Sequence, residues 1–431
     1  MGGMFETLRN AFAIKDLRKK IIFTLLAILV YRLGAQIPVP GISTAAFTEL
    51  ANRFGQLGSF MDIISGGAFK QVSIFALGIQ PYINASIIMQ LLTYAIPALQ
   101  EMQEQGEEGR KKIQKITRYV TIGLALTMSI MYWRATRVAS INSLPGWLNA
   151  LVVIGSFTAG SAFIMWLGEQ INDKGIGNGI SIIIAIGIIS RIPDMIQALY
   201  YTALNWTQTK NIVIALLGVA AAVFVFLFII TLVVFISSAE RRIPVQYAKR
   251  VIGRKMYGGQ SSYLPIKVNQ SGVLPVIFAV SVMMLPSTLV NIFGAKGPVA
   301  EWFANFNRNP LYYVIYSILI FAFTFFYSSM SFNPVEISNN LQKNGGFVPG
   351  IRPGRPTSEF ILNSARKLNW FEALFLVFIV LLPTLLSFVT GTTQALWFGG
   401  TGVLIVVGVA MDMVNQLEAQ MMMRHHKGFL D

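Results

Sequence analysis

Ten long stretches of the chain are almost free of charged residues, and each is close in length to a helix that crosses a lipid bilayer. A helix needs roughly 20 apolar residues to span the hydrocarbon core. The stretches lie at about 21–39, 72–96, 117–133, 150–168, 178–199, 211–238, 271–293, 310–332, 371–390 and 395–411. Because lipid offers the backbone no hydrogen-bond partner, each stretch should be helical. The sequence therefore predicts an all-α polytopic membrane protein, with 117–133 and 178–199 as its weakest spans.

Basic residues are distributed unequally between the two sides of these spans. An even number of spans places both termini on one side, which carries 25 of the 34 Lys and Arg residues, against 8 on the other side. The remaining one, Arg32, falls within the first span. Since cytoplasmic loops carry the excess of positive charge, we expect both termini in the cytoplasm.

The N-terminal stretch "FETLRNAFAIKDLRKK" is basic and amphipathic. One helical face of it carries Phe5, Leu8, Phe12 and Leu17. It has no continuous apolar region and no small-residue cleavage site, so we expect a helix in the membrane interface rather than a cleaved signal peptide.

The residue inventory argues against an enzyme or a metal protein. The chain has no cysteine, and its only histidines are the adjacent His425 and His426. It contains no GxxxxGK[ST] phosphate loop and no GxGxxG motif. We therefore expect no cofactor and no metal, with energy supplied by a partner or a gradient. Outside the two weakest spans, Arg32 and Glu372 are the only Asp, Glu, Lys, Arg or His residues in the spans. Ion-coupled transporters usually bury carboxylates or histidines, which disfavours a small-solute secondary transporter with inverted repeats but leaves it as the alternative.

Two predicted cytoplasmic loops, 240–270 and 333–370, are long and patterned. The first alternates polar and apolar residues around a basic tip, which predicts a hairpin. The hairpin would carry the basic residues Arg241, Arg242, Lys249, Arg250, Arg254 and Lys255. They either only enforce the topology or form a docking surface for an acidic partner or RNA phosphate. The second loop has four Gly and three Pro within 344–356, which predicts successive turns that display Arg352.

A short apolar piece, Ser59 to Ile64, precedes Ser-Gly-Gly and the second span. It is too short to cross a bilayer. It could form a re-entrant helix or an interfacial helix, and the residues alone favour neither.

Several long motifs resemble the SecY family of protein-conducting channels. They are "SIFALGIQPYINASIIMQLL", "GEQINDKGIGNGISIII", "ERRIPVQYAKR", "SFNPVEISNNLQKNGGFVPG" and "FVPGIRPG". The resemblance runs from about residue 15 to about residue 425. It implies ten transmembrane helices in two inverted five-helix halves around an hourglass pore, with a short re-entrant plug helix. The implied regions are an N-terminal segment 1–20, halves 21–199 and 200–411, and a C-terminal tail 412–431.

The resemblance also implies three sets of functional residues. The plug, about 58–69, would include Phe60, Met61, Ile63, Ile64, Gly66 and Gly67. The apolar ring of the pore would consist of Ile79, Ile83, Ile184, Ile188, Ile277 and Ile405. The lateral gate, between the second and seventh spans, would include Gln80, Asn84, Gln90 and Asn269, with Pro81, Pro275 and Pro286 easing helix bending.

The resemblance implies a channel in the bacterial plasma membrane that translocates unfolded preproteins and releases membrane segments sideways into lipid. The expected membrane partners are SecE, with SecG as a further subunit, and the lipid bilayer. The SecA ATPase or the translating ribosome would drive transport, and the basic loops would contact ribosomal RNA. Signal sequences of preproteins are the expected substrates.

Overall fold

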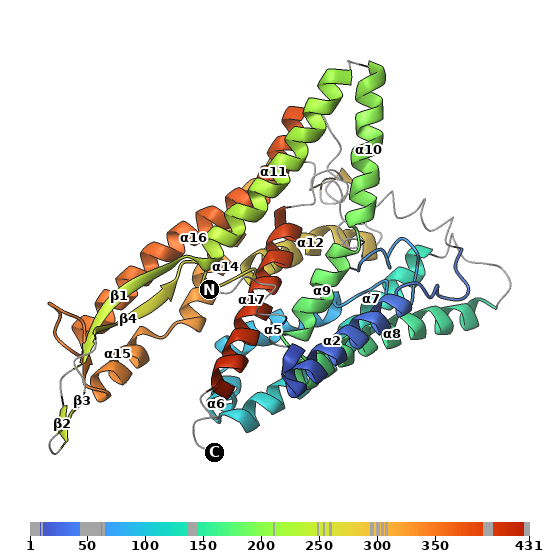
Figure 1. The fold of residues 1–431 in the computed structure, drawn as a ribbon. Helices are drawn as coiled ribbons and strands as arrows, with labels where there is room; N and C mark the ends of the chain where they lie inside the picture. The colour runs from blue at the N-terminus through green and yellow to red at the C-terminus, as the bar shows by residue number, and fades with distance from the viewer. Residues whose placement is uncertain are drawn as a thin grey trace. The chain divides into compact units, whose positions relative to one another are not determined.

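Helices make up most of the chain that the computed structural model describes (Figure 1). The described residues are 9, 12–43, 62, 65–136, 145–209, 212–247, 250–252, 255–257, 261–293, 297–298, 302, 306, 309–390 and 400–425. They belong to two compact units. Unit 1 comprises residues 1–200, 292–294 and 409–431, and unit 2 comprises 201–291 and 295–408.

The helices before the sheet cover the first six predicted spans. They are α2 (Lys15–Gly34), α5 (Gln80–Ala95), α6 (Pro97–Glu104), α7 (Glu107–Thr136), α8 (Gly146–Lys174), α9 (Gly179–Ile189), α10 (Ile192–Thr209) and α11 (Ile212–Ser238). The later helices are α12 (Leu274–Phe293), α14 (Pro310–Ser331), α15 (Pro334–Lys343), α16 (Arg355–Thr390) and α17 (Gly400–His425). Each predicted span overlaps at least one of these helices, so the all-α membrane fold is confirmed.

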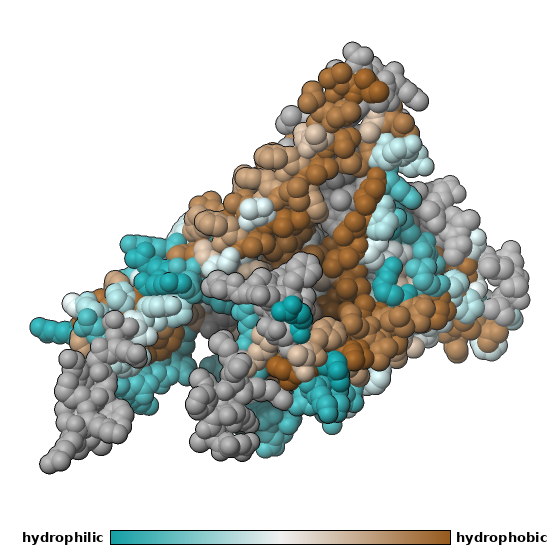
Figure 2. Space-filling model, in the orientation of Figure 1, coloured by the Kyte–Doolittle hydropathy of each residue, from teal (hydrophilic) through white to brown (hydrophobic). Residues whose placement is uncertain are grey.

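Five helices in the described part are long and apolar enough to cross a membrane, or six if the bent pair α5 and α6 counts as one. Helix α11 is the most apolar of them and leaves large side chains such as Leu216, Phe224 and Phe235 exposed. Figure 2 shows an apolar surface along this helix. Exposed apolar side chains on a long helix are typical of contact with lipid.

The second span differs from the prediction at both ends. Residues 72–79 form turns, and the helix α5 begins at Gln80. Pro81 lies in the first turn of α5, where its missing N–H costs no hydrogen bond, so it starts the helix and does not bend it. At the other end, the chain turns by 98° between α5 and α6, directly before Pro97.

Two predicted connecting regions are more helical than expected. The loop 333–370 contains α15 and the first turns of α16, leaving turns only around residues 344–354. The tail 412–431 continues α17 as far as His425. Leu417 of this extension packs with Leu17 and Ile176 in a buried cluster, which supplies the burial that keeps the tail helical.

The predicted hairpin in 240–270 is confirmed and gains a third strand. Strand β1 (Glu240–Tyr247) pairs antiparallel with β4 (Ser261–Lys267), with Ile243 opposite Leu264. The short strands β2 (Arg250–Ile252) and β3 (Lys255–Tyr257) pair at its tip. Strand β5 (Gly346–Phe347), from the second loop, joins the free side of β1. The two loops therefore form one folded structure in unit 2.

Candidate functional site

Residues 65–79 form a non-helical segment that is buried within unit 1. Phe69, Val72 and Phe75 are 1%, 0% and 3% exposed. Phe69 and Val72 belong to an apolar cluster with side chains of α8, among them Phe157. A segment this deeply buried is fixed by the same apolar packing that stabilises the helices around it.

The backbone of this segment is held in a strained but well-supported conformation. The Val39 amide donates to the Val72 carbonyl at 2.8 Å, and the Ile74 amide donates to the Ile37 carbonyl at 3.0 Å. Val72 has a φ of 51°, a left-handed value that is a genuine outlier for a β-branched residue. Such strain costs on the order of 1–3 kcal/mol and persists only where the surroundings over-determine it. The packing at Val72 therefore outweighs the local backbone preference.

Two helix glycines allow the segment to approach the helices closely. A Cβ at Gly160 of α8 would lie 1.9 Å from the Ile74 carbonyl oxygen, and one at Gly34 of α2 would lie 2.1 Å from the Phe75 ring. Neither distance is sterically possible. Side chains larger than hydrogen at these positions would push the segment away from α2 and α8.

We expect Gly160→Ala to destabilise the protein by about 1–3 kcal/mol, the usual cost of overpacking a core, because the added methyl group meets backbone. Gly155→Ala on the same helix is the matched control, because nothing lies within 4 Å of its Cβ position. Thermal unfolding in detergent checks the pair. Equal unfolding temperatures for the two variants would contradict the close approach of Ile74 to α8.

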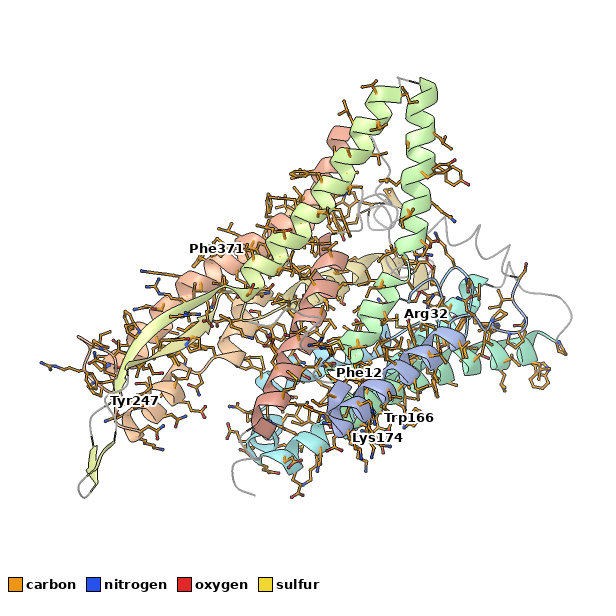
Figure 3. All side chains as sticks on the ribbon, viewed as in Figure 1. Phe12, Arg32, Trp166, Lys174, Tyr247 and Phe371 are labelled. Carbon is orange, nitrogen blue, oxygen red and sulfur yellow. The ribbon has the colours of Figure 1, made fainter. Side chains whose placement is uncertain are left out.

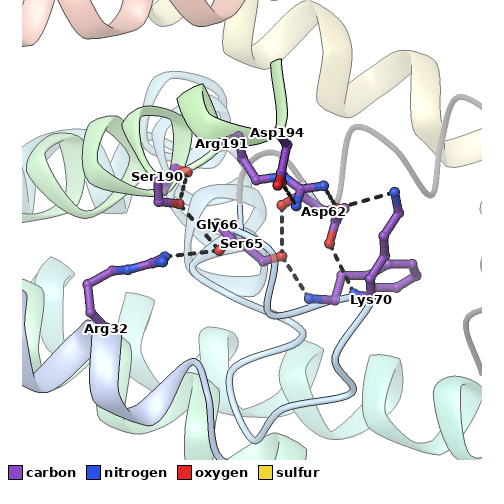
Figure 4. A network of polar contacts seen from close by, with 10 residues as sticks. Arg32, Asp62, Ser65, Gly66, Lys70, Ser190, Arg191 and Asp194 are labelled. Carbon is purple, nitrogen blue, oxygen red and sulfur yellow. Dashed lines mark hydrogen bonds and ion pairs between the residues drawn. The ribbon is translucent and has the colours of Figure 1, made fainter. Parts of the chain in front are cut away.

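Gly66 and Gly67 lie near the start of the segment and have φ values of 66° and 91°. Glycine adopts such left-handed angles without steric cost, which is why a Gly-Gly pair can break the chain direction before the span. The Gly66 carbonyl accepts hydrogen bonds from Arg32 Nη1 at 2.9 Å and from Ser190 Oγ at 3.3 Å (Figure 4). Arg32 lies on α2 (Figure 3). Ser190 is the residue that caps the C-terminal end of α9. The arginine of the first predicted span therefore binds this turn.

Ahead of Gly66, Asp62 has a fully buried carboxylate bound by cations. Arg191 Nη2 donates to Asp62 Oδ2, and the Lys70 amide donates to Asp62 Oδ1 at 3.0 Å. The Lys70 ammonium group lies 3.8 Å from Asp62 Oδ2, and the Lys70 side chain is 42% exposed. Arg191 also donates to Asp194, at the start of α10 (Figure 4). The four side chains form a cluster without net charge.

The predicted ring residues are divided between the two units. Ile79, Ile83, Ile184 and Ile188 lie in unit 1, each at most 7% exposed. Ile277 is half-buried and Ile405 is 4% exposed, and both lie in unit 2. Ile79 directly precedes α5 and Ile83 lies in its first turn, so both are at the start of this helix. That the six side chains form one collar stays a prediction.

The predicted gate residues of α5 lie in its first turns and in its second half. Gln80 is buried at the helix start, and Asn84 and Gln90 are half-buried. Gln90 Nε2 donates to Ser86 Oγ at 3.2 Å within the same helix. The role of these residues in a gate stays a prediction.

The chain just before α12 is hydrogen-bonded to other helices of unit 2. Asn269 Nδ2 donates to Ser237 Oγ of α11 at 3.3 Å. The Ser271 amide donates to Glu372 Oε1 of α16 at 2.8 Å, and Glu372 is fully buried. Pro286 lies within α12 and Pro275 within its first turn. These bonds join the beginning of the seventh span to its own half.

The predicted partner-binding residues lie on the sheet and in the turn before α16. Arg241 and Arg242 are exposed on β1, and Arg242 lies 4.7 Å from the centroid of the Tyr263 ring. A hydrogen bond from Arg242 to Glu240 raises the pKa of the Arg242 guanidinium. Arg250 and Lys255 lie in β2 and β3, whereas Lys249 and Arg254 lie outside the described residues.

Arg352 is exposed in a turn whose backbone is tightly defined. Gly350 and Gly354 have φ values of 81° and 94°. The Thr357 hydroxyl donates to the Arg352 carbonyl at 2.8 Å, and the Ile351 amide donates to the Val348 carbonyl at 3.1 Å. The turns therefore present the guanidinium from a fixed backbone, as its Pro and Gly neighbours predict.

A sequence model of the SecY family matches residues 73–414 of the chain. A curated protein of Halalkalibacterium halodurans named protein translocase subunit SecY is 45% identical over 441 residues, covering 99% of this chain and 100% of the relative. The chain belongs to the SecY family. A Thermotoga maritima relative with the same name is 42% identical over 447 residues, covering 99% of this chain and 98% of the relative.

Solved structures of channels from the same group have the same fold. One of them, a protein-conducting channel, has a TM-score of 0.63 at 19% identity and covers 93% of this chain and 92% of its own. Another, Sec61 in a canine ribosome-channel complex, has a TM-score of 0.58 at 18% identity with the same coverage of both chains. The SecY-family fold is therefore shown for nearly the whole chain.

The SecY-family plug expected at about 58–69 is only partly within the described residues. Phe60, Met61, Ile63 and Ile64 lie outside them. Asp62 is helical, but residues 65–69 form turns and not the continuation of a helix. The left-handed angles of Gly66 and Gly67 cause this difference.

Sequence reasoning about a SecY-family chain missed Asp62 and Arg191. The charge count places Arg191 among the loop arginines, and the apolar side chains of residues 59–64 predict a re-entrant or interfacial helix without any role for their one carboxylate. The signal that could have found Asp62 is this isolated carboxylate in an apolar stretch, because such a group is rarely buried without a cationic partner. Which cation binds it could not be deduced, because Arg191 is 129 residues away in the sequence.

Proposed function

We propose that the chain is the channel subunit of a bacterial protein translocase and conducts unfolded preproteins across the plasma membrane. The observation that carries this function is 45% identity to a protein translocase subunit over essentially the whole chain. A solute transporter, the second class considered, has no comparable support. Among the described residues, no group of three or more His, Cys, Asp or Glu side chains could hold a metal ion.

In the proposed mechanism the chain does no chemistry on its substrate. The ring isoleucines would form a dry collar, because branched aliphatic side chains offer an ion no replacement for its hydration shell. The collar would yield around a peptide of any sequence because it makes no specific hydrogen bonds. The plug, about 58–69, would close the idle pore. In one SecY channel of known structure, the plug domain stabilises the closed state and maintains a membrane seal.

Sideways release of membrane segments would occur between α5 and α12. Gln80, Asn84, Gln90 and Asn269 would supply polar contacts at this gate. Interhelical hydrogen bonds in membranes contribute only about 0.6–2 kcal/mol each, enough to favour closure and weak enough to break. The two five-span halves, 21–199 and 200–411, would separate at the gate between α5 and α12. Both termini would lie in the cytoplasm.

Cytoplasmic partners would bind the sheet and the turn that carries Arg352. Two relatives of known structure, canine Sec61 and yeast Ssh1, were solved in complexes with a ribosome. We propose that the basic residues of 240–257 contact ribosomal RNA and that Arg352 docks the SecA ATPase. SecE and SecG would complete the complex within the membrane.

Reconstitution of the purified chain with SecE and SecA in vesicles tests this function. We expect ATP-dependent protection of a preprotein from external protease, with no protection when SecA or ATP is omitted. The control is the same preprotein without its signal sequence. Protection that needs neither SecA nor ATP, or none under any condition, would contradict the assignment.

A further inference from the structure

Asp62 and the buried segment 65–79 together consist of a polar junction, residues 62 and 65–67, and a firmly packed base, residues 68–79. Ala68, Val72 and Ser73 are completely buried, and Phe75 stacks against Tyr31 with ring centroids 6.0 Å apart. At the junction, by contrast, the contacts of Asp62 and Gly66 are polar and come from α2 and the C-terminal end of α9. Apolar packing holds the base, whereas a few specific groups hold the junction.

Local sequence explains why Arg191 stands where it does. It follows the last residues of α9, and its amide donates to the Ile188 carbonyl at 3.0 Å. A cation is favourable at the C-terminal end of a helix, and Asp194 is favourable in the first turn of α10. The guanidinium is therefore fixed at the break between the two helices, with one arm for each carboxylate.

The two carboxylates that share Arg191 differ in their surroundings. The side chain of Asp62 is 0% exposed, whereas that of Asp194 is 56% exposed. An ionised carboxylate that stays buried after losing its cation is strongly unfavourable, so the group must either move to solvent or take up a proton. If Asp62 moves to solvent, Arg191 still forms its ion pair with Asp194.

We propose that the ion pair between Asp62 and Arg191 is the latch that holds Asp62 and the turn at residues 65–67 in the position they take when the channel is closed. Asp194 is its release partner, because it retains Arg191 when Asp62 moves into water. Gly66 and Gly67 absorb the backbone change, and residues 68–79 stay packed. The inference rests on the proposed function in identifying this position with the closed state.

Two backbone hydrogen bonds report directly on the latch. The Gly67 amide donates to the Asp62 carbonyl at 2.9 Å, and the Lys70 amide donates to the Asp62 carboxylate at 3.0 Å. Both break when Asp62 moves. The Val39 amide donates to the Val72 carbonyl of the base, and the Ile74 amide of the base donates to the Ile37 carbonyl, so these two amides serve as internal controls.

Hydrogen exchange of the full chain, reconstituted with SecE, tests the latch through these amides. We expect Arg191→Gln to speed exchange at Gly67 and Lys70 by about tenfold, the change that about 1.4 kcal/mol produces, while Val39 and Ile74 stay unchanged. Arg191→Lys should fall between Arg191→Gln and the parent, because it keeps the charge and loses the two-armed geometry. Asp194→Asn should slow exchange, because Arg191 then has only Asp62 as a partner.

Lys70→Gln is the matched control, because it removes the same charge from the exposed side of the cluster. Its exchange rates should change less than about threefold, as expected for an exposed pair. Unchanged exchange at Gly67 and Lys70 in Arg191→Gln, or faster exchange in Asp194→Asn, would overturn the latch whatever the channel does. If Arg191→Gln speeds exchange but the idle channel stays sealed, the latch stands and the stopper role of the segment fails. If Arg191→Gln does not fold, Asp194→Asn decides the matter alone.

Discussion

Arg352→Glu is expected to leave the protein folded and to reduce SecA-driven transport at least about tenfold. Reversing a charge at a docking surface replaces an attraction with repulsion, and losing one partner of a desolvated interfacial pair costs about 2–5 kcal/mol. Folding should not suffer, because the side chain is exposed and precedes the first turn of α16, where a negative charge is favourable. Protease protection of a preprotein in reconstituted vesicles, together with the unfolding temperature, gives both readouts.

Arg355→Glu is the control that separates position from charge. Arg355 is three residues further on, its side chain is 91% exposed, and it pairs with Glu359 on the same helix. Arg355→Glu makes the same change of charge as Arg352→Glu near the same end of α16, but at a fully solvated side chain. Transport by this variant should stay close to that of the parent. Equal loss in both variants would assign the effect to net charge and would remove Arg352 from the docking surface.

The helices of this protein were predictable because lipid imposes one rule on the backbone. Every apolar stretch long enough to span the membrane had to be helical, and each overlaps a helix in the structure. The strands β1 and β4 were predictable for a similar reason, since alternation specifies a strand with one buried face.

The differences occur where tertiary contacts outweigh local pattern. Residues 72–79 are apolar enough to continue a helix, but Gly66, Gly67 and the buried Val72 direct them into turns. The tail near Leu417 is polar enough to be solvated, yet it finds a cluster with Leu17 and Ile176. In both cases the residues that make these contacts are far apart in the sequence, so a local sequence pattern does not reveal them.

The site could be predicted only in its apolar part. Isoleucines four apart on one helix face can be selected by resemblance, although resemblance does not state what they touch. Asp62 and Arg191 were out of reach, because an ion pair between residues 129 apart has no local signature. Long-range polar pairs are specified by the fold that brings them together.

Hydrating the collar and removing the plug should each open the idle channel to ions, and the two changes together should do so most. Exchanging Ile83, Ile188 and Ile277 for Ser places hydroxyls where an ion would otherwise lose its hydration shell. We expect conductance to rise on the order of tenfold, the effect of lowering a barrier by about 1.4 kcal/mol. Deleting residues 60–67 removes Asp62 with its latch and should raise conductance independently. Transport of preproteins should persist, because none of these side chains does chemistry.

The combined variant is the decisive one, because the two barriers act in series and each limits the rise in conductance that loss of the other produces. Both single variants should therefore conduct more than the parent and less than the combined variant. The same three isoleucines exchanged for Val should leave conductance unchanged, since Val keeps the collar apolar and branched. Planar-bilayer recordings without preprotein or SecA compare the five proteins. A sealed combined variant would mean that the ion path avoids these residues, and a leaky Val variant would assign the seal to packing volume and not to hydration.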